Sequence, residues 1–398
     1  MVSFLHSADW QIGKPYARVQ DPDKRARLRQ VRIETISRIG AWIEAEQAAF
    51  LLVAGDLFDS PTPSASDVSA VCQAIGKLAI PVLVIPGNHD HGAPGSVWHT
   101  PFFQAEQQRR APNLTVLLER TPLELEQAVL LPCPLLRRSD ELSPTAWLQQ
   151  LNWEALPAEK PRILLAHGSV QGFTAADLDA DEENPASGSN RLQLDAGLLA
   201  KLDYIALGDW HGLTQVHPHC WYSGTPEPDR FPRHPDYQGG QVLAVQLERG
   251  QPAQVTPRPT AGLTWLPLQT DLNSLADVER LEQQLQQALG DEPGQQLLLL
   301  EASGRLNLQA LERYQQLLER LEAQLLRLKR RGQVQQAPDA AELSSLTNRP
   351  ADPLISRVAA SLQQELEADG ASADPQQQAL LQLALAELHQ CVGSSPCV

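Results

Sequence analysis

Phe50-Leu51-Leu52-Val53-Ala54-Gly55-Asp56 is an apolar run that ends in a glycine and an aspartate. An apolar run bounded by turn-forming residues is typical of a strand buried on both faces, as in a parallel sheet. The neighbouring runs repeat the pattern: Val2–Ala8 ends at Asp9, and Val82–Ile85 ends near Gly87-Asn88. Polar residues therefore follow the predicted strands at their carboxyl ends.

Helical patterns separate these runs. Asp21-Pro22 is typical of an N-cap followed by proline in the first turn, and the apolar residues of 28–43 recur at helical spacing. Ser64 and Asp67 form a capping-box pattern before a helix that we expect to end near Ala79. This alternation predicts a parallel sheet with its functional side chains at the carboxyl ends of the strands.

Strands predominate after residue 110, and they predict a second sheet packed on the first. We expect them at 114–118, 128–131, 163–166, 204–207 and 241–247. The acidic segment 177–189 is predicted to be a long surface loop. The expected fold of residues 1–262 is therefore α/β, a sandwich of two sheets flanked by helices.

The alternation restarts at about Trp265. Strands at 265–268, 296–301 and 325–331, with helices at 274–289 and 308–321, predict a small separate α/β domain over residues 263–335. Residues 336–398 are predicted to form a linker and two C-terminal helices, at about 352–367 and 375–391. These helices either dock a partner or pack on their own domain.

Composition limits the function classes. The chain has 398 residues and five scattered cysteines, which favour several cores and a reducing cytoplasm over a disulfide framework. No run approaches the ~20 apolar residues of a membrane span, and the N-terminus lacks the basic region of a signal peptide. We therefore expect a cytoplasmic protein without membrane association.

The net charge of −16 is not that of a generally basic nucleic-acid binder. Any basic surface must therefore be local, and one candidate lies near the N-terminus. It either contacts phosphate groups or forms a solvated helix face. Its cationic residues are Arg18, Lys24, Arg25, Arg27, Arg29, Arg32 and Arg38. A second candidate lies in the predicted small α/β domain, and its residues are Arg327, Lys329, Arg330 and Arg331.

Five short motifs end in carboxylate, imidazole or amide side chains, and four of them directly follow predicted strands. A dinuclear metal site that performs phosphate chemistry needs such donors from several strand ends at one edge. The motifs are Asp9-Trp10-Gln11, Gly55-Asp56-Leu57-Phe58-Asp59, Gly87-Asn88-His89-Asp90, His167-Gly168 and Gly208-Asp209-Trp210-His211.

These motifs resemble those of the calcineurin-like metallophosphoesterase superfamily, and most closely those of the nuclease subunit of the bacterial SbcCD complex. The stretch from His6 to Lys14 resembles that family's opening motif, and Ser223 to Pro228 resembles the loop after its last metal ligands. The resemblance covers most of the chain. It implies a two-sheet metallophosphoesterase sandwich, a capping domain, and a C-terminal segment that grips a coiled-coil ATPase.

The resemblance also implies two divalent metal ions held by seven residues. The ligands of the first ion would be Asp9, Gln11, Asp56 and His211. The ligands of the second would be Asp56, Asn88, His167 and Asp209. The catalytic residues would be His89, which stabilises the transition state or protonates the leaving oxygen, and Asp90, which orients His89. Asp59 would lie next to the site without binding a metal ion itself.

Two positions depart from the family pattern, which has histidine where this chain has Gln11 and Asp209. The changes indicate either a decayed site or a retuned one. Because Asp9, Asp56 and Asp209 are all carboxylates, a retuned site would favour Mn²⁺, or Mg²⁺, over Zn²⁺.

Three functions stay open on the sequence. The first is a DNA repair exonuclease or endonuclease subunit that hydrolyses phosphodiester bonds with a hydroxide activated by two metal ions. Its partners would be DNA and an SbcC-like coiled-coil ATPase, with a homodimer as a further assembly. The second is a phosphoesterase for a nucleotide or another small molecule, and the third is a non-catalytic scaffold. The residues beyond 262 favour the first.

Overall fold

A computed structural model describes residues 1–139, 142–170, 190–232, 237–290, 293–336, 340–350 and 352–368, with parts of 377–388. The chain divides into two compact units, Met1–Leu263 and Thr264–Val398. The predicted acidic loop at 177–189 and much of the predicted helix at 375–391 lie outside the described residues.

The first sheet of the larger unit has the strand order β12-β11-β1-β2-β3-β4. Strands β1 to β4 are parallel to one another. Strand β11 pairs antiparallel with β1 on one side and with β12 on the other. The strands are β1 (Val2–Ser7), β2 (Leu51–Ala54), β3 (Val82–Ile85), β4 (Leu114–Val116), β11 (Gln241–Leu247) and β12 (Gln254–Pro259). The predicted parallel sheet is confirmed.

The second sheet has the order β5-β6-β7-β8-β10-β9, in which β6, β7, β8 and β10 are parallel. Its strands are β5 (Leu123–Glu124), β6 (Val129–Cys133), β7 (Arg162–His167), β8 (Tyr204–Gly208), β9 (Thr214–His217) and β10 (Cys220–Tyr222). Both sheets thus contain parallel strands with functional motifs after their last residues.

The two sheets pack face to face through a shared apolar layer. Phe4 and Leu52 of the first sheet and Leu130 and Ile163 of the second belong to one buried cluster. Burying each such side chain contributes about 1.5–3 kcal/mol to stability. The predicted two-sheet α/β sandwich is confirmed.

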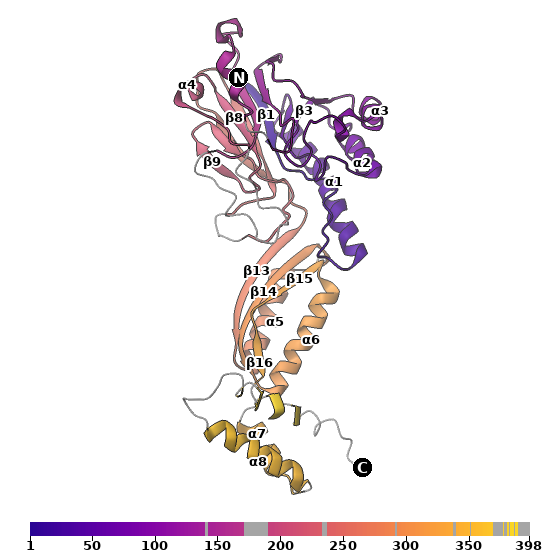
Figure 1. Ribbon diagram of the computed structural model, residues 1–398, viewed down its shortest axis with the longest axis vertical. Coiled ribbons are helices and arrows are strands. Elements are labelled where there is room, and N and C mark those ends of the chain that lie inside the picture. The colour runs from indigo at the N-terminus through magenta and orange to yellow at the C-terminus, as the bar shows by residue number, and fades with distance from the viewer. Residues whose placement is uncertain are drawn as a thin grey trace. The chain divides into compact units, whose positions relative to one another are not determined.

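Three helices cover the outer face of the first sheet (Figure 1). They are α1 (Pro22–Ala45), α2 (Ala65–Ile75) and α3 (Pro101–Arg110). The side chain of Asp21 accepts hydrogen bonds from two backbone N–H groups of the first turn of α1, and Ser64 accepts one in α2, as the sequence predicts. These caps fix where α1 and α2 begin.

The smaller unit has a four-stranded sheet in which β14 pairs in parallel with each of its neighbours. Helices α5 (Leu275–Leu289) and α6 (Leu308–Gln324) share an apolar cluster with it. The strands are β13 (Thr264–Leu272), β14 (Gln296–Leu306), β15 (Arg327–Arg331) and β16 (Val334–Gln336). The predicted β-α-β-α-β order is present, and β13 and β14 extend beyond the predicted apolar runs.

Two further helices follow, α7 (Ala340–Thr347) and α8 (Pro353–Ala368). Leu346, Ala359 and Leu385 form a small buried cluster, so the C-terminal helical residues pack on one another. Leu354 stays 72% exposed. Among the helices in the described parts of the chain, none combines the length and apolar character that a membrane span requires.

Candidate metal centre

Five strand ends from the two sheets supply the polar side chains of one site. Asp9 follows β1, Asp56 follows β2, and Asn88 follows β3 in the first sheet. His167 is the last residue of β7, and Asp209 directly follows β8. Because parallel strands end at the same edge of a sheet, both sheets present these residues at the carboxyl ends of their strands.

Asp9, Asp56 and His167 are buried, and each offers a ligand atom within 4.8 Å of the ligand atoms of the other two. The His167 Nε2 atom lies 2.7 Å from Asn88 Oδ1 and 3.7 Å from one carboxylate oxygen of both Asp56 and Asp209. We call these five residues the carboxylate–histidine cluster. Buried oxygen and imidazole donors at these distances fit a divalent cation.

Positive backbone φ angles accompany these ligands. The φ angles are 55° at Asp9, 54° at Asp56, 107° at Asp209 and 42° at Gln11. Such conformations are rare for residues other than glycine and cost roughly 1–3 kcal/mol each, and they concentrate at functional sites. The sequence patterns contained no indication of this strain.

Two glycines allow the strand ends to approach closely. A Cβ atom on Gly87 would lie 2.2 Å from Asp56 Oδ1, and one on Gly208 would lie 1.9 Å from the carbonyl oxygen of Ala54. Any larger residue would therefore push the ligand loops apart. This is the physical reason for glycine before Asn88 and Asp209.

The charge of the cluster is unbalanced without a cation. The Nδ1 atom of His167 lies 2.8 Å from the carbonyl oxygen of Ala54, to which it donates, so its Nε2 atom faces the carboxylates. Burial lowers the pKa of His167, but the carboxylates of Asp56, Asp9 and Asp209 outweigh burial and raise this pKa to about 9. Burial also raises the pKa of Asp9 well above its usual range, and its acidic neighbours add to the effect. The cluster therefore retains a proton where a metal ion would bind.

The structure corrects the expected partner of His89. The carboxylate of Asp90 accepts hydrogen bonds from the backbone N–H groups of Phe58 and Gly87, at 3.0 and 2.7 Å, and so ties two loops together. The His89 Nδ1 atom instead lies 3.0 Å from the carbonyl oxygen of Asp59 and 4.0 Å from its carboxylate. The expectation that Asp90 orients His89 is wrong, because a buried carboxylate is better satisfied by two backbone donors.

Gln11 and His211 lie beside the cluster but contact each other, with 3.3 Å between their Nε2 atoms. Among the described residues, His211 does not join the group of donors that lie within 4.8 Å of one another. Lys14 donates to Gln11 Oε1 at 2.8 Å, and Asp229 Oδ2 lies 3.1 Å from His211 Nδ1. Sequence reasoning missed Lys14 and Asp229 as members of the site, since only their three-dimensional placement brings them there.

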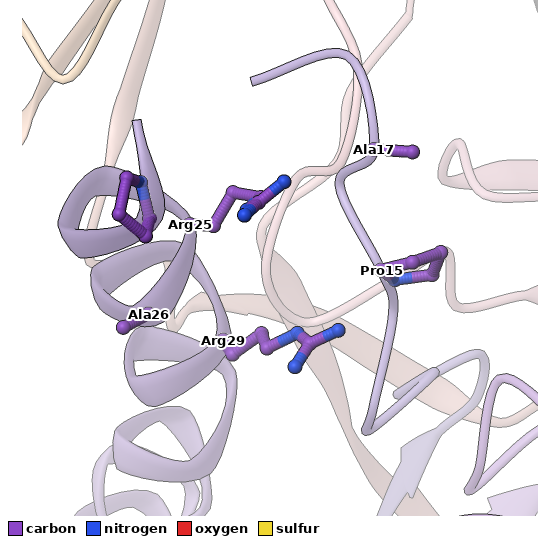
Figure 2. A pocket seen from close by; sticks show the side chains of 6 residues that line it. Pro15, Ala17, Arg25, Ala26 and Arg29 are labelled. Carbon is purple, nitrogen blue, oxygen red and sulfur yellow. The ribbon is translucent and has the colours of Figure 1, made fainter. Parts of the chain in front are cut away.

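The predicted N-terminal basic surface divides into two groups. Arg32 is buried and donates to the carbonyl oxygens of Asp9 and Trp10, so it supports the first ligand loop. Arg25 and Arg29 extend from α1 toward the segment around Pro15 and Ala17, as Figure 2 shows, and line a cavity of about 360 Å³. Arg27 pairs with Glu34 and Arg38 with Glu227, whereas the cavity gives Arg25 and Arg29 a position to meet an external anion.

A two-sheet α/β sandwich with buried carboxylates and a histidine at its strand ends defines the class of metal-dependent phosphoesterases. Residues 2–239 match the family described as calcineurin-like phosphoesterase, and the chain belongs to that family. A solved crystal structure is 12% identical, with 65% of this chain and 98% of that chain covered and a TM-score of 0.39, a likeness too distant to support an argument.

Proposed function

We propose that this chain is a divalent-metal-dependent phosphodiesterase that hydrolyses DNA. The observation that supports hydrolysis most strongly is the buried group of Asp9, Asp56 and His167, whose ligand atoms lie within 4.8 Å of one another. Family membership supports the same reaction class, because calcineurin-like phosphoesterases act on phosphoester bonds.

The carboxylate–histidine cluster would hold the ion. A divalent ion bound there would polarise the phosphoryl oxygens and lower the pKa of a water molecule that serves as the nucleophile. Asn88 would contribute its amide oxygen, which already points at His167 Nε2. We propose Mn²⁺, with Mg²⁺ as the alternative, because carboxylate and amide oxygens outnumber the single imidazole.

His89 is suited to protonate the leaving oxygen. Its side chain is 37% exposed and lies beside Asp59 rather than inside the cluster. Although burial alone lowers the pKa of His89, the Asp56 charge and the Asp59 contacts raise it above its ordinary value, which favours the protonated ring. As the water oxygen bonds to phosphorus and the P–O bond breaks, His89 gives its proton to the departing alkoxide.

Three features support DNA as the substrate. Arg25 and Arg29 line one cavity, and the side chains of Arg330 and Arg331 are exposed at the end of β15. Cationic side chains at such places neutralise backbone phosphates without reading base sequence. The second unit, which a small-molecule phosphoesterase does not require, is the third feature.

We also propose an SbcC-like coiled-coil ATPase as a partner, as the resemblance to the SbcD nuclease subunit implies, with homodimerisation as a further assembly. The exposed side chains of Leu354 and Val358 on α8, 72% and 41% accessible, support an apolar contact there. A coiled coil presents the complementary apolar seam.

Two assays test the proposal in sequence. Hydrolysis of bis-p-nitrophenyl phosphate with Mn²⁺ tests phosphodiesterase activity, and its absence at every metal concentration would favour a non-catalytic scaffold. Linear duplex DNA and free nucleotides, compared at equal phosphodiester concentration, test the substrate. We expect DNA to be cleaved faster; cleavage of nucleotides alone would support the small-molecule phosphoesterase instead.

A further inference from the structure

Four side chains next to the carboxylate–histidine cluster form a closed ring of hydrogen bonds. The Lys14 ammonium donates to Gln11 Oε1 at 2.8 Å and contacts Asp229 Oδ2 at 2.9 Å. The Gln11 Nε2 atom lies 3.3 Å from His211 Nε2, and His211 Nδ1 lies 3.1 Å from Asp229 Oδ2. We call these four residues the Lys14 ring.

The Lys14 ammonium fixes the orientation of the Gln11 amide. An ammonium group can only donate, so Gln11 must turn its oxygen toward Lys14 and its NH₂ group toward His211. The His211 Nε2 atom then faces the Gln11 NH₂ group, and its Nδ1 atom lies 3.1 Å from Asp229 Oδ2 and 3.0 Å from Arg230 Nη2. Reversing the Gln11 amide would set its NH₂ group against the lysine ammonium.

This arrangement uses the two lone pairs that a first metal ion would need. The Gln11 oxygen is engaged by Lys14, and the His211 Nε2 lone pair is engaged by the Gln11 amide. The ring is largely shielded from solvent, with Gln11 2% and His211 6% exposed. These residues therefore do not fit a metal ion as they stand, in contrast to the carboxylate–histidine cluster.

The ring already contains its own positive charge. The Lys14 ammonium faces the Asp229 carboxylate and lies 3.9 Å from Asp59 Oδ1. Asp59 in turn lies beside His89, so the ammonium stands close to the proposed reaction centre. A cation at this position attracts an anionic phosphoryl group without coordinating it.

We propose that Lys14 replaces the first metal ion of this centre, so that the protein binds a single divalent ion in the carboxylate–histidine cluster. Gln11 belongs to the same replacement, because its amide links the ammonium to His211. The inference rests on the proposed function in one respect, which is that the carboxylate–histidine cluster binds a divalent ion. Glutamine in place of histidine at position 11 would therefore change how many metal ions the protein binds, and not which metal it prefers.

Metal content tests the proposal without relying on activity. Equilibrium dialysis with Mn²⁺, followed by elemental analysis, should find about one ion per chain, and the bound Mn²⁺ should give the spectrum of an isolated ion in electron paramagnetic resonance. About two ions per chain, with the exchange-coupled spectrum of a close pair, would overturn it.

A double variant tests the cause. Gln11→His combined with Lys14→Gln restores an imidazole donor and removes the competing ammonium, so Mn²⁺ content should rise from about one to about two ions per chain. Lys77→Gln, an exposed lysine outside the site, is the matched control and should stay at the wild-type value. A folded double variant that still binds one ion would overturn the role of Lys14, and if the variant does not fold, the wild-type stoichiometry decides.

The same samples separate this inference from the proposed function. Wild-type protein that binds one ion and hydrolyses bis-p-nitrophenyl phosphate supports both. One ion without hydrolysis supports the replacement by Lys14 and contradicts the proposed function. Hydrolysis with two ions supports the proposed function and overturns the replacement.

Discussion

The two halves of the centre are built from neighbouring loops but satisfy their charges in opposite ways. In the carboxylate–histidine cluster, Asp9, Asp56 and Asp209 surround one imidazole, and their negative charge raises the pKa of His167 to about 9. In the Lys14 ring, the Lys14 ammonium faces the Asp229 carboxylate and donates to Gln11, and Arg230 pairs with the same carboxylate. One side of the site is therefore suited to bind an external cation, whereas the other side already contains the Lys14 ammonium.

Removing a cluster ligand should give the largest effect. Asp56→Ala deletes a buried carboxylate that lies 3.7 Å from His167 Nε2, so Mn²⁺ binding should be lost and kcat/KM for bis-p-nitrophenyl phosphate should fall by about 10³-fold or more. Glu319→Ala, an exposed acidic residue of the second unit, is the control. A folded Asp56→Ala protein with wild-type metal content and rate would remove the cluster from the mechanism.

His89→Ala should separate proton transfer from metal binding. His89 contacts Asp59 and belongs neither to the carboxylate–histidine cluster nor to the Lys14 ring. The variant should therefore keep its Mn²⁺ content, while kcat falls by roughly 10²–10³-fold. Rates measured at saturating Mn²⁺, with metal content determined in parallel, check this. Loss of the metal together with the activity would instead place His89 among the ligands.

Protons should compete with the metal in the cluster. The pKa of His167, raised to about 9 in the metal-free protein, lies above its ordinary value. The stability that the bound proton contributes is therefore present below the ordinary pKa and lost as pH rises through 9. Since an ion must displace this proton, apparent Mn²⁺ affinity should rise roughly tenfold per pH unit from pH 7 to 9 and then level off. Anaerobic equilibrium dialysis measures this, and a pH-independent affinity would contradict it.

The arginines of the cavity in Figure 2 should have the smallest effect, because they belong to neither half. Replacing Arg25 and Arg29 by Gln should weaken DNA binding several-fold and lower the slope of log affinity against log salt by about 1–2. Hydrolysis of bis-p-nitrophenyl phosphate should not change. Binding titrations at several salt concentrations test this, and an unchanged slope would exclude a phosphate contact.

The sequence predicted one half of the centre better than the other. Residues such as Asp9 and Asp56 follow apolar strands, and parallel strands bring their ends together, so the strand pattern alone was sufficient to place them. The Lys14 ring depends on Asp229, which lies in a loop far along the chain and follows no strand. No periodicity places such a residue, and for the same reason the contact between His89 and Asp59 was assigned to Asp90.

The secondary structure shows a similar limit. The apolar runs located β2 and β3, and the caps at Asp21 and Ser64 located the starts of α1 and α2. The β13 and β14 strands were predicted too short, because their second halves alternate exposed and buried residues and include polar ones. Pairing between neighbouring strands, which extends them, is decided by tertiary structure.

Anomalous diffraction from Mn²⁺-soaked crystals, recorded at the manganese absorption edge, shows whether and where the carboxylate–histidine cluster binds the ion. We expect one strong peak about 2.1–2.3 Å from oxygens of Asp9 and Asp56 and from His167 Nε2, with Lys14 still hydrogen-bonded to Gln11. A map without a peak among these three residues, at a Mn²⁺ concentration that supports hydrolysis, would contradict it.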